Sequence, residues 1–295
     1  MPKFEQNGQV INLTQKRRQK VFHIRRQKRE PMATRVISIT SGKGGVGKTN
    51  IVANLGYSLR KAGNRVLIFD ADLGLGNLDV LLGLIPQYNL SHVIEGQKRL
   101  SEIIITGPGG IHILPASSGI QELTRLSSAQ KNVMFYELNV LLSEYDIVLF
   151  DTAAGISSNV LAFNASANEI MIVVTPEPTS ITDAYALMKI LSVDYQEKNF
   201  RLIVNMAKCV KEADEVSRHL CLVAERFLDV SIEYFGSILW DENVKKGVRK
   251  QKIVSQMAPM TRASRNFSEL TQRMVQSAQR KPISEAGNLI RQDVF

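Results

Sequence analysis

The stretch SGKGGVGKTN, residues 41–50, places Gly42, Gly47, Lys48 and Thr49 in the pattern G-x-x-x-x-G-K-[ST]. In such a loop, backbone N–H groups curl around a β-phosphate, the lysine binds β- and γ-phosphate oxygens, and the hydroxyl ligates Mg²⁺. A chance match in a chain of this length has a probability on the order of 1%. The stretch therefore predicts a phosphate-binding loop, and it leaves one further lysine, Lys43, without an explanation.

Short apolar segments alternate with helical patterns around this loop. The expected strands are residues 35–40, 65–70, 111–116, 146–151, 169–175, 200–205 and 233–240, and the clearest helices are 49–61, 128–144, 179–194 and 211–227. Continuous apolar strands separated by helices require a mostly parallel sheet with helices on both faces. The predicted fold is a three-layer α/β fold.

Carboxylates end, or closely follow, two of the expected strands. Asp70 and Asp72 lie in FDADLG, and Asp151 ends DIVLFD. Because the carboxyl ends of parallel strands meet at one edge of a sheet, we expect all three beside the phosphate loop. Asp151 is the natural acid on the Mg²⁺ side, and either Asp70 or Asp72 would position the attacking water while the other braces the loop. This combination is typical of phosphoryl transfer.

The net charge of +9 is concentrated at the two ends of the chain. Residues 1–31 carry +7 and residues 245–295 carry +8, so residues 32–244 carry −6. Basic ends are attracted to anionic lipid, nucleic acid or acidic partners. We expect residues 1–31 to be a basic, disordered or weakly helical arm, residues 32–255 to be the main domain, and residues 256–295 to be a C-terminal helix with a basic tail.

Other classes of protein find little support in the sequence. No apolar run approaches the roughly 18 residues that span a bilayer, and the N-terminus lacks the apolar segment of a secretory signal. Cys209 and Cys221 form no C-x-x-C pair, and the four histidines are scattered. We therefore expect a cytoplasmic protein without a metal site built from protein ligands alone.

Four motifs together resemble one family. SGKGGVGKTN, VLIFDADLGLGNLD, DIVLFDTAAG and LIVN are similar to the MinD/ParA family of ATPases, whose deviant Walker A motif reads K-G-G-x-G-K-[ST]. Within that family, HVIEG, LPASSGIQEL and TPEPTSITDAYAL are most similar to the flagellar-number regulators. The resemblance covers roughly residues 35–255. It implies a P-loop NTPase fold that binds ATP and Mg²⁺ and hydrolyses ATP slowly under the control of partners.

The resemblance also gives Lys43 a role. In this family the matching lysine crosses a face-to-face homodimer, formed on ATP binding, to the phosphates of the partner's ATP. A residue acting in this way can contribute roughly 10³ to 10⁵ in rate, as an arginine finger does. With Lys48, the resemblance makes Lys43 and Asp72 the catalytic residues, Asp72 acting on the attacking water. It places Thr49, Asp70 and Asp151 in the Mg²⁺ shell.

The remaining implied residues surround the nucleotide. Asn77 belongs to a first switch and Gly155 begins a second. Glu177 lies near the dimeric nucleotide site, Asn205 selects adenine, and Asp241 lies in the loop that flanks the base. The expected nucleotide-binding residues are Gly42, Gly44, Gly45, Val46, Gly47, Lys48, Thr49, Asn50, Glu177, Asn205 and Asp241.

The chain departs from the family pattern at several positions. Ala153 replaces the proline of D-T-P-A-G, which loosens the turn after Asp151. Met206 stands where an arginine often follows the adenine-selecting asparagine, and Trp240 replaces a proline before Asp241. We expect both substitutions to affect base stacking and nucleotide affinity. The flagellar branch often has a short Asp-Gln-Ala motif near its start that stimulates a partner GTPase. Residues 1–31 carry basic residues and glutamine instead, which argues against that role for the arm.

Partners and localisation follow from the same resemblance. The implied partners are a flagellar signal-recognition-type GTPase, basal-body switch proteins and a flagellar transcription activator. Residues 267–281, with apolar Phe267, Leu270, Met274 and Val275, form either a final helix packed on the body or an amphipathic helix for an anionic membrane surface. The last residues, AGNLIRQDVF, are a second, shorter membrane candidate. The expected location is the cytoplasm, with ATP-dependent peripheral association with the inner membrane or cell pole.

The leading hypothesis is an ATP-dependent dimerising switch that controls flagellar number, placement and assembly. Two alternatives stay open: a MinD-like ATPase that selects the division site, and a ParA-like partitioning ATPase whose basic ends bind DNA nonspecifically. Bacterial tyrosine kinases of this fold carry a C-terminal tyrosine cluster, whereas Tyr234 is the last tyrosine here. Iron–sulfur relatives need cysteines that this chain lacks.

Overall fold

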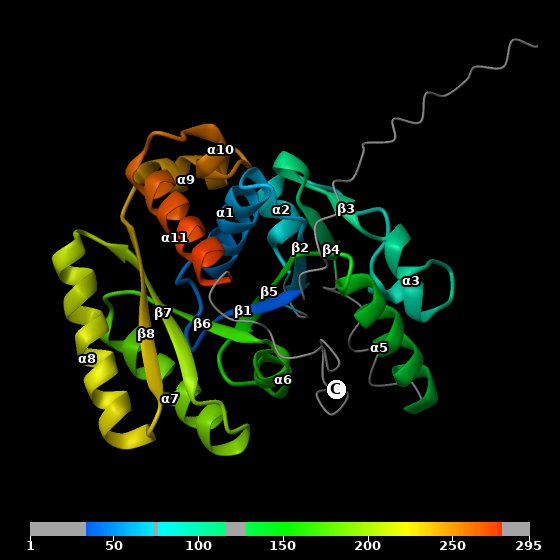
Figure 1. The fold of residues 1–295 in the computed structure, drawn as a ribbon. Helices are drawn as coiled ribbons and strands as arrows, with labels where there is room; N and C mark the ends of the chain where they lie inside the picture. Colours follow the sequence, from blue (N-terminus) through cyan, green and yellow to red (C-terminus); the bar gives the residue numbers. More distant parts are fainter. Residues whose placement is uncertain (1–33, 73–75, 116–127, 279–295) are drawn as a thin grey trace, which may run out of the picture. The chain divides into compact units, whose positions relative to one another are not determined.

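The computed structural model describes residues 34–72, 76–115 and 128–278. Within these ranges, eight strands form one sheet in the order β3-β4-β2-β5-β1-β6-β7-β8 (Figure 1). The strands are β1 (Arg35–Ser41), β2 (Val66–Ala71), β3 (Ile105–Thr106), β4 (His112–Pro115), β5 (Ile147–Ala154), β6 (Glu169–Val174), β7 (Asn199–Ala207) and β8 (Ser231–Leu239). All neighbouring strands run parallel except β3, which pairs antiparallel with β4. The predicted mostly parallel α/β fold is confirmed.

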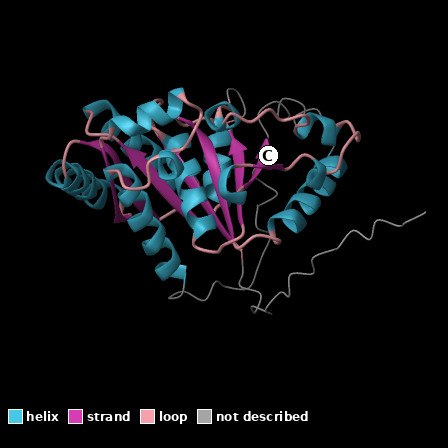
Figure 2. Ribbon diagram, turned by 90° about the horizontal axis from the view of Figure 1, so that it is seen from above, coloured by secondary structure: helices cyan, strands magenta, loops and turns pink. Residues whose placement is uncertain are grey.

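Helices lie on both faces of the sheet (Figure 2). They are α1 (Lys48–Lys61), α2 (Leu78–Leu82), α3 (Leu90–Ile94), α5 (Ser128–Leu142), α6 (Ser158–Ser166), α7 (Pro178–Asp194), α8 (Val210–Leu228), α9 (Glu242–Arg249), α10 (Val254–Met257) and α11 (Arg262–Ala278), with short 3₁₀ turns at Leu100–Glu102 and Pro108–Gly110. The alternation of side chains along a strand divides the core between the faces. In β1, Ile37 and Ile39 pack with α1 and α11, whereas Val36 packs on the opposite face with α5.

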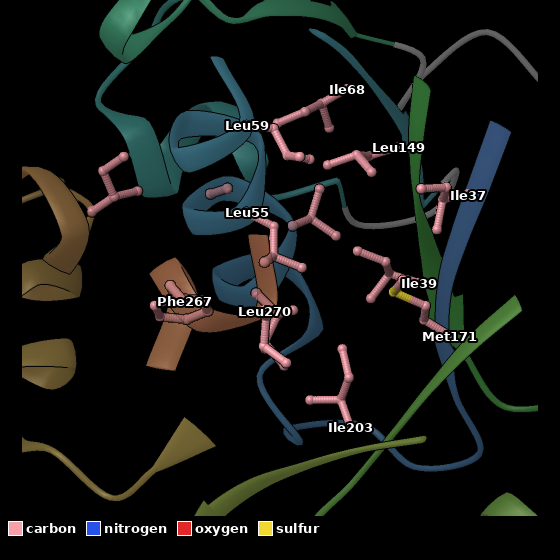
Figure 3. Close-up of a cluster of buried hydrophobic side chains, with 14 of the residues drawn as sticks. Ile37, Ile39, Leu55, Leu59, Ile68, Leu149, Met171, Ile203, Phe267 and Leu270 are labelled. Atoms are coloured by element: carbon pink, nitrogen blue, oxygen red, sulfur yellow. The ribbon is translucent and has the colours of Figure 1, made fainter. Parts of the chain in front are cut away.

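The core on the first face joins the beginning of the described chain to its end. Leu55 and Leu59 of α1 pack with Phe267 and Leu270 of α11 over the strands (Figure 3). Phe267 and Met274 are 1% and 0% exposed. Of the two readings of this amphipathic segment, packing on the body is therefore the observed one for the residues up to Ala278. The stretch AGNLIRQDVF and the N-terminal arm lie outside the described residues.

A charge network fixes the last turn of α11 to the amino-terminal edge of the sheet. The Arg35 side chain is buried, donates from Nε to Glu169 Oε1 at 2.8 Å and donates from Nη1 to the Met274 carbonyl at 2.7 Å. Glu169 also pairs with Arg201, whose Nε donates to Glu233 at 2.9 Å. The polar residues predicted to form the site lie at the opposite, carboxyl edge of the sheet.

None of the helices in the described ranges combines the length and the apolar character that crossing a bilayer requires.

Candidate nucleotide-binding site

The loop between β1 and α1 follows a path that side chains would obstruct. Gly45 and Gly47 have φ values of +81° and +90°, in the left-handed region that favours glycine. A Cβ atom on Gly42 would lie 2.2 Å from the backbone carbonyl carbon and oxygen of Asp183 in α7. A Cβ atom on Gly47 would lie 2.5 Å from the Asn205 amide nitrogen. The loop is therefore enclosed by α7 on one side and the end of β7 on the other.

The two lysines of the loop have different surroundings. Lys48 is 8% exposed, and its Nζ donates to Ser41 Oγ at 2.8 Å. Ser41 Oγ donates in turn to the Lys43 carbonyl at 2.7 Å, so one hydroxyl connects both residues. Burial lowers the pKa of the Lys48 ammonium, and the charges of Asp151 and Asp72 oppose this effect. Lys48 thus points into the site, where an anion would offset the cost of its burial.

Lys43 points to the outside of the loop. Its Nζ donates to Glu177 Oε2 at 2.6 Å and to Thr179 Oγ1 at 2.8 Å. The side chains of Lys43 and Glu177 are 35% and 64% exposed. The lysine that the motif does not need for its own phosphates is therefore held at the surface by the start of α7.

Two carboxylates lie side by side near the carboxyl ends of β2 and β5. Asp70 and Asp151 are partners in the register of these strands and are 4% and 2% exposed. Burial, followed by the charge of Asp70, raises the pKa of Asp151 to about 8, although a hydrogen bond with the Thr49 side chain lowers it. Burial is also the main cause that raises the pKa of Asp70 to about 7. Asp151 Oδ1 is buried without a hydrogen-bond partner among the described residues.

Asp72 lies next to this pair. Its backbone N–H donates to Asp70 Oδ1 at 3.3 Å, and its charge raises the pKa values of both Asp70 and Asp151. Across the described part of the chain, no group of three His, Cys, Asp or Glu side chains is arranged to hold a metal by itself. A cation at these carboxylates would therefore need further oxygen ligands, such as phosphate and water.

The expected base-binding residues lie at the ends of β7 and β8. Asn205 Nδ2 donates to the Val46 carbonyl at 2.7 Å, and Asn205 Oδ1 accepts from the Met206 N–H at 2.9 Å. Met206 has a φ of +60°. Trp240 is 47% exposed, and Lys245 Nζ lies 5.5 Å from the centre of a Trp240 ring. An exposed indole is thus available beside the strand that carries Asn205.

Asp241 is engaged as a helix cap. Its Oδ1 accepts from the Asn243 N–H at 2.9 Å at the start of α9, and its Oδ2 accepts from the Ala263 N–H at 3.1 Å in α11. Burial acts to raise the pKa of Asp241, but these backbone hydrogen bonds, together with side-chain hydrogen bonds from Asn243 and Thr261, hold the pKa below its usual value. Both carboxylate oxygens of Asp241 thus have backbone partners, and its expected place in the base-flanking loop stays a prediction.

The structure brings most of the predicted site residues to one edge of the sheet. The Asp70–Asp151 pair and Thr49 lie with Lys48, whereas Lys43 pairs with Glu177. Two contributors were not predicted: the hydroxyls of Ser41 and Thr179, which accept hydrogen bonds from the two lysines. The motif spacing contains no signal for either contact, since both depend on where a lysine side chain turns.

These residues fit a nucleotide phosphate and Mg²⁺. The glycine loop leaves its backbone close to any bound group, and Lys48 supplies a buried positive charge. Asp151 Oδ1 has no partner within the part of the chain that the structure describes, and carboxylate oxygen is a preferred ligand of Mg²⁺. A cation there would also favour the ionised form of the two carboxylates, whose pKa values burial raises.

Comparison with known proteins identifies the family. Residues 34–206 match a family model described as an AAA domain. The chain is 45% identical over 239 residues to the antiactivator FleN of Pseudomonas aeruginosa, covering 81% of this chain and 85% of FleN. The chain belongs to the MinD/ParA family of ATPases. The predicted family is thereby confirmed.

Two further MinD/ParA relatives are similar along most of their length. The flagellum site-determining protein YlxH of Helicobacter pylori is 40% identical over 238 residues, 80% of each chain. The structure of the septum site-determining protein MinD of Pyrococcus horikoshii, solved in complex with Mg-ADP, superposes with a TM-score of 0.67 at 25% identity and covers 83% of this chain and 97% of that one. The fold of this relative thus accounts for most of this chain.

Proposed function

We propose that this MinD/ParA protein is an ATP-dependent dimerising switch that controls the number and placement of flagella and flagellar assembly. The observation that carries the proposal is the 45% and 40% identity to FleN and YlxH over about four-fifths of the chain. One of these relatives is named as an antiactivator and the other as a flagellum site-determining protein, so both names describe regulation.

Within one chain, the proposed roles follow the contacts. The backbone N–H groups of residues 42–47 and the Lys48 ammonium bind the phosphates of ATP. Thr49, Asp70 and Asp151 hold Mg²⁺, which supplies charge neutralisation of the phosphates when it is bound. Asn205 fixes the base end of the loop through the Val46 carbonyl. Asp72, next to the buried carboxylate pair, orients the attacking water.

Across two chains, Lys43 supplies the positive charge that one chain lacks. Lys48 already occupies the inside of the loop, while Lys43 points outward at the surface. A lysine that points outward is better placed to contact the phosphates bound by a second chain than those bound by its own loop. ATP binding closes the dimer, Lys43 of each protomer completes the site of the other, and hydrolysis opens it again. The output is a changed affinity for other proteins and for membrane.

The proposed partners are those of the flagellar branch: a signal-recognition-type GTPase, basal-body switch proteins and a flagellar transcription activator. The name antiactivator, carried by FleN, supports the last of these. Peripheral attachment to an anionic membrane is assigned to residues beyond Ala278, because the apolar face of α11 is already buried.

The flagellar role is tested in cells that lack this protein. We expect the number or position of flagella to change and the wild-type gene to restore both. A strain with normal flagella but misplaced division septa would support the MinD-like alternative instead. Loss of a plasmid or chromosome without a flagellar defect would support the ParA-like alternative.

The dimer is tested with Lys43→Ala. We expect ATP turnover to fall by about 100-fold or more. Loss of a full finger contribution would lower the rate by roughly 10³ to 10⁵, and a smaller loss would mean that water partly replaces the ammonium. Light scattering after size exclusion should show an ATP-dependent dimer for the wild type. Lys189→Ala, an exposed change on α7, should keep wild-type turnover. Normal hydrolysis by Lys43→Ala would refute the role of this lysine in trans.

A further inference from the structure

Among the described residues, the hydrogen bonds of the Lys43 ammonium both lead to the beginning of α7. Glu177 is the residue before the helix, and Thr179 belongs to its first turn. Both accept from the same ammonium, at 2.6 Å and 2.8 Å. An ammonium has three N–H donors, so these two acceptors occupy most of its capacity. The residue proposed to act across the dimer is therefore already engaged in the isolated chain.

The backbone on each side of this contact is fixed independently. Pro178 restricts the preceding residue to extended conformations, and Glu177 has φ −71° and ψ 131°. On the side of the loop, Ser41 Oγ donates to the Lys43 carbonyl, and Gly42 packs directly against the Asp183 backbone. Loop and helix thus hold the lysine and its acceptors at a set separation, and only the side chains need to move to break the contact.

We propose that Glu177 and Thr179 are positioning residues that retain Lys43 on its own chain, and that ATP-dependent dimerisation exchanges this contact for the phosphates of the partner's nucleotide. This inference rests on the proposed function, since it requires that Lys43 act in trans. A carboxylate and a triphosphate compete for one ammonium. The contact within one chain thereby raises the concentration of ATP-bound protein at which dimers form.

The exposure of the pair determines the size of the effect. With Lys43 35% and Glu177 64% exposed, solvent screens their attraction. An exposed pair of this kind shifts an equilibrium by at most about fivefold. Both protomers must release a lysine when the dimer forms, so the two contributions multiply to at most about 25-fold in the dimerisation constant. Such a contact delays dimerisation without preventing it.

The test measures dimerisation of the full chain by sedimentation velocity, with a slowly hydrolysed ATP analogue and Mg²⁺. Glu177→Gln removes the charge with little change in shape, and we expect its dimer dissociation constant to fall by about 3- to 25-fold. Thr179→Val should shift it in the same direction by a smaller factor. Glu242→Gln is the matched control, because Glu242 is also an exposed acid near a lysine, Lys246, at 3.9 Å. It should leave the constant unchanged.

A double-mutant cycle separates this role from a structural one. If Glu177 acts through Lys43, the effect of Glu177→Gln must disappear in a Lys43→Ala background. A merely structural change would persist there. The control Glu242→Gln should bind the nucleotide analogue with the affinity of the wild type.

The outcomes distinguish the two levels of the proposal. If the wild type dimerises and Glu177→Gln weakens or does not change the dimer, the retention of Lys43 is wrong, and weakening would instead make Glu177 a ligand of the dimeric nucleotide site. If the wild type forms no dimer with the analogue, the proposed switch fails, and the retention of Lys43 fails with it.

Discussion

Gly42 shows how a single position can fix the geometry of the site. The residue carries no side chain because the backbone of Asp183 occupies the space that a Cβ would fill, at 2.2 Å. Through this contact the phosphate loop rests on α7, the helix whose first residues hold Lys43. The glycines of the motif are usually explained by the phosphate they surround. Here one of them is equally required by a neighbouring helix.

The first prediction concerns this contact. Gly42→Ala should lower the free energy of unfolding by about 1–3 kcal/mol, because two backbones must separate to admit a methyl group. It should weaken ATP binding as well. Gly44→Ala is the control, since its Cβ would meet only Ala154 Cβ, at 4.0 Å. Urea unfolding and nucleotide titration measure both effects, and equal stability of the two variants would contradict the steric explanation.

At the scale of elements, the sequence indicated most strands to within two residues, because buried parallel strands are continuous apolar runs. β3 escaped prediction, since two residues on an antiparallel edge form no such run. For α11, the apolar spacing suited a helix packed on protein as well as one lying on membrane. The difference lies in another element: Gly236 of β8 leaves room for Leu270, whose Cδ2 would be 2.7 Å from a Cβ at that position. The sequence of α11 alone therefore could not predict that Leu270 packs into this space.

Part of the site could be predicted from the sequence, because the apolar strands could be predicted from it. Asp70 and Asp151 lie near the carboxyl ends of β2 and β5, and Lys48 begins the helix after β1. The topology of a parallel sheet brings these strand ends together. The contacts of Ser41 and Thr179 depend on side-chain direction instead. The capping of two helices by Asp241 depends on the position of α11, which is distant in sequence.

The second prediction tests the packing of α11. Phe267→Ala should lower the free energy of unfolding by about 3–5 kcal/mol, because Phe267 is 1% exposed in the core shared with α1. Gln272→Ala changes an exposed residue of the same helix and should stay within about 0.5 kcal/mol of the wild type. Chemical denaturation followed by circular dichroism provides the measurement. A Phe267→Ala variant as stable as Gln272→Ala would show that α11 does not stabilise the core.

At the scale of the whole molecule, the buried carboxylates link stability to pH. The pKa values of Asp70 and Asp151 are raised to about 7 and about 8, so the folded state retains protons that the unfolded chain loses near pH 4. Stability from these groups is complete below their unfolded pKa values and is lost as the pH rises through the folded ones.

The third prediction follows from that sign. Without nucleotide and with a chelator present, the free energy of unfolding should fall between about pH 5 and pH 8, by up to about 1.4 kcal/mol per pH unit for each carboxyl. Asp151→Asn should flatten the curve, and Mg-ADP should do so as well by favouring the ionised carboxylates. Fluorescence of Trp240, the single tryptophan, reports unfolding at each pH. A stability that rises over this window would contradict the raised pKa values.

The hydrogen bond from Arg35 to the Met274 carbonyl joins residues that are 239 positions apart. At a synthesis rate of roughly 5–20 residues per second, α11, the helix that covers this side of the core, is therefore made about 10 to 50 s after β1. Throughout that interval the apolar face of α1 has no α11 to pack on, although the phosphate loop has already been made. The growing chain consequently needs protection from aggregation until α11 has been made, and nucleotide bound to the loop before then cannot replace the missing helix.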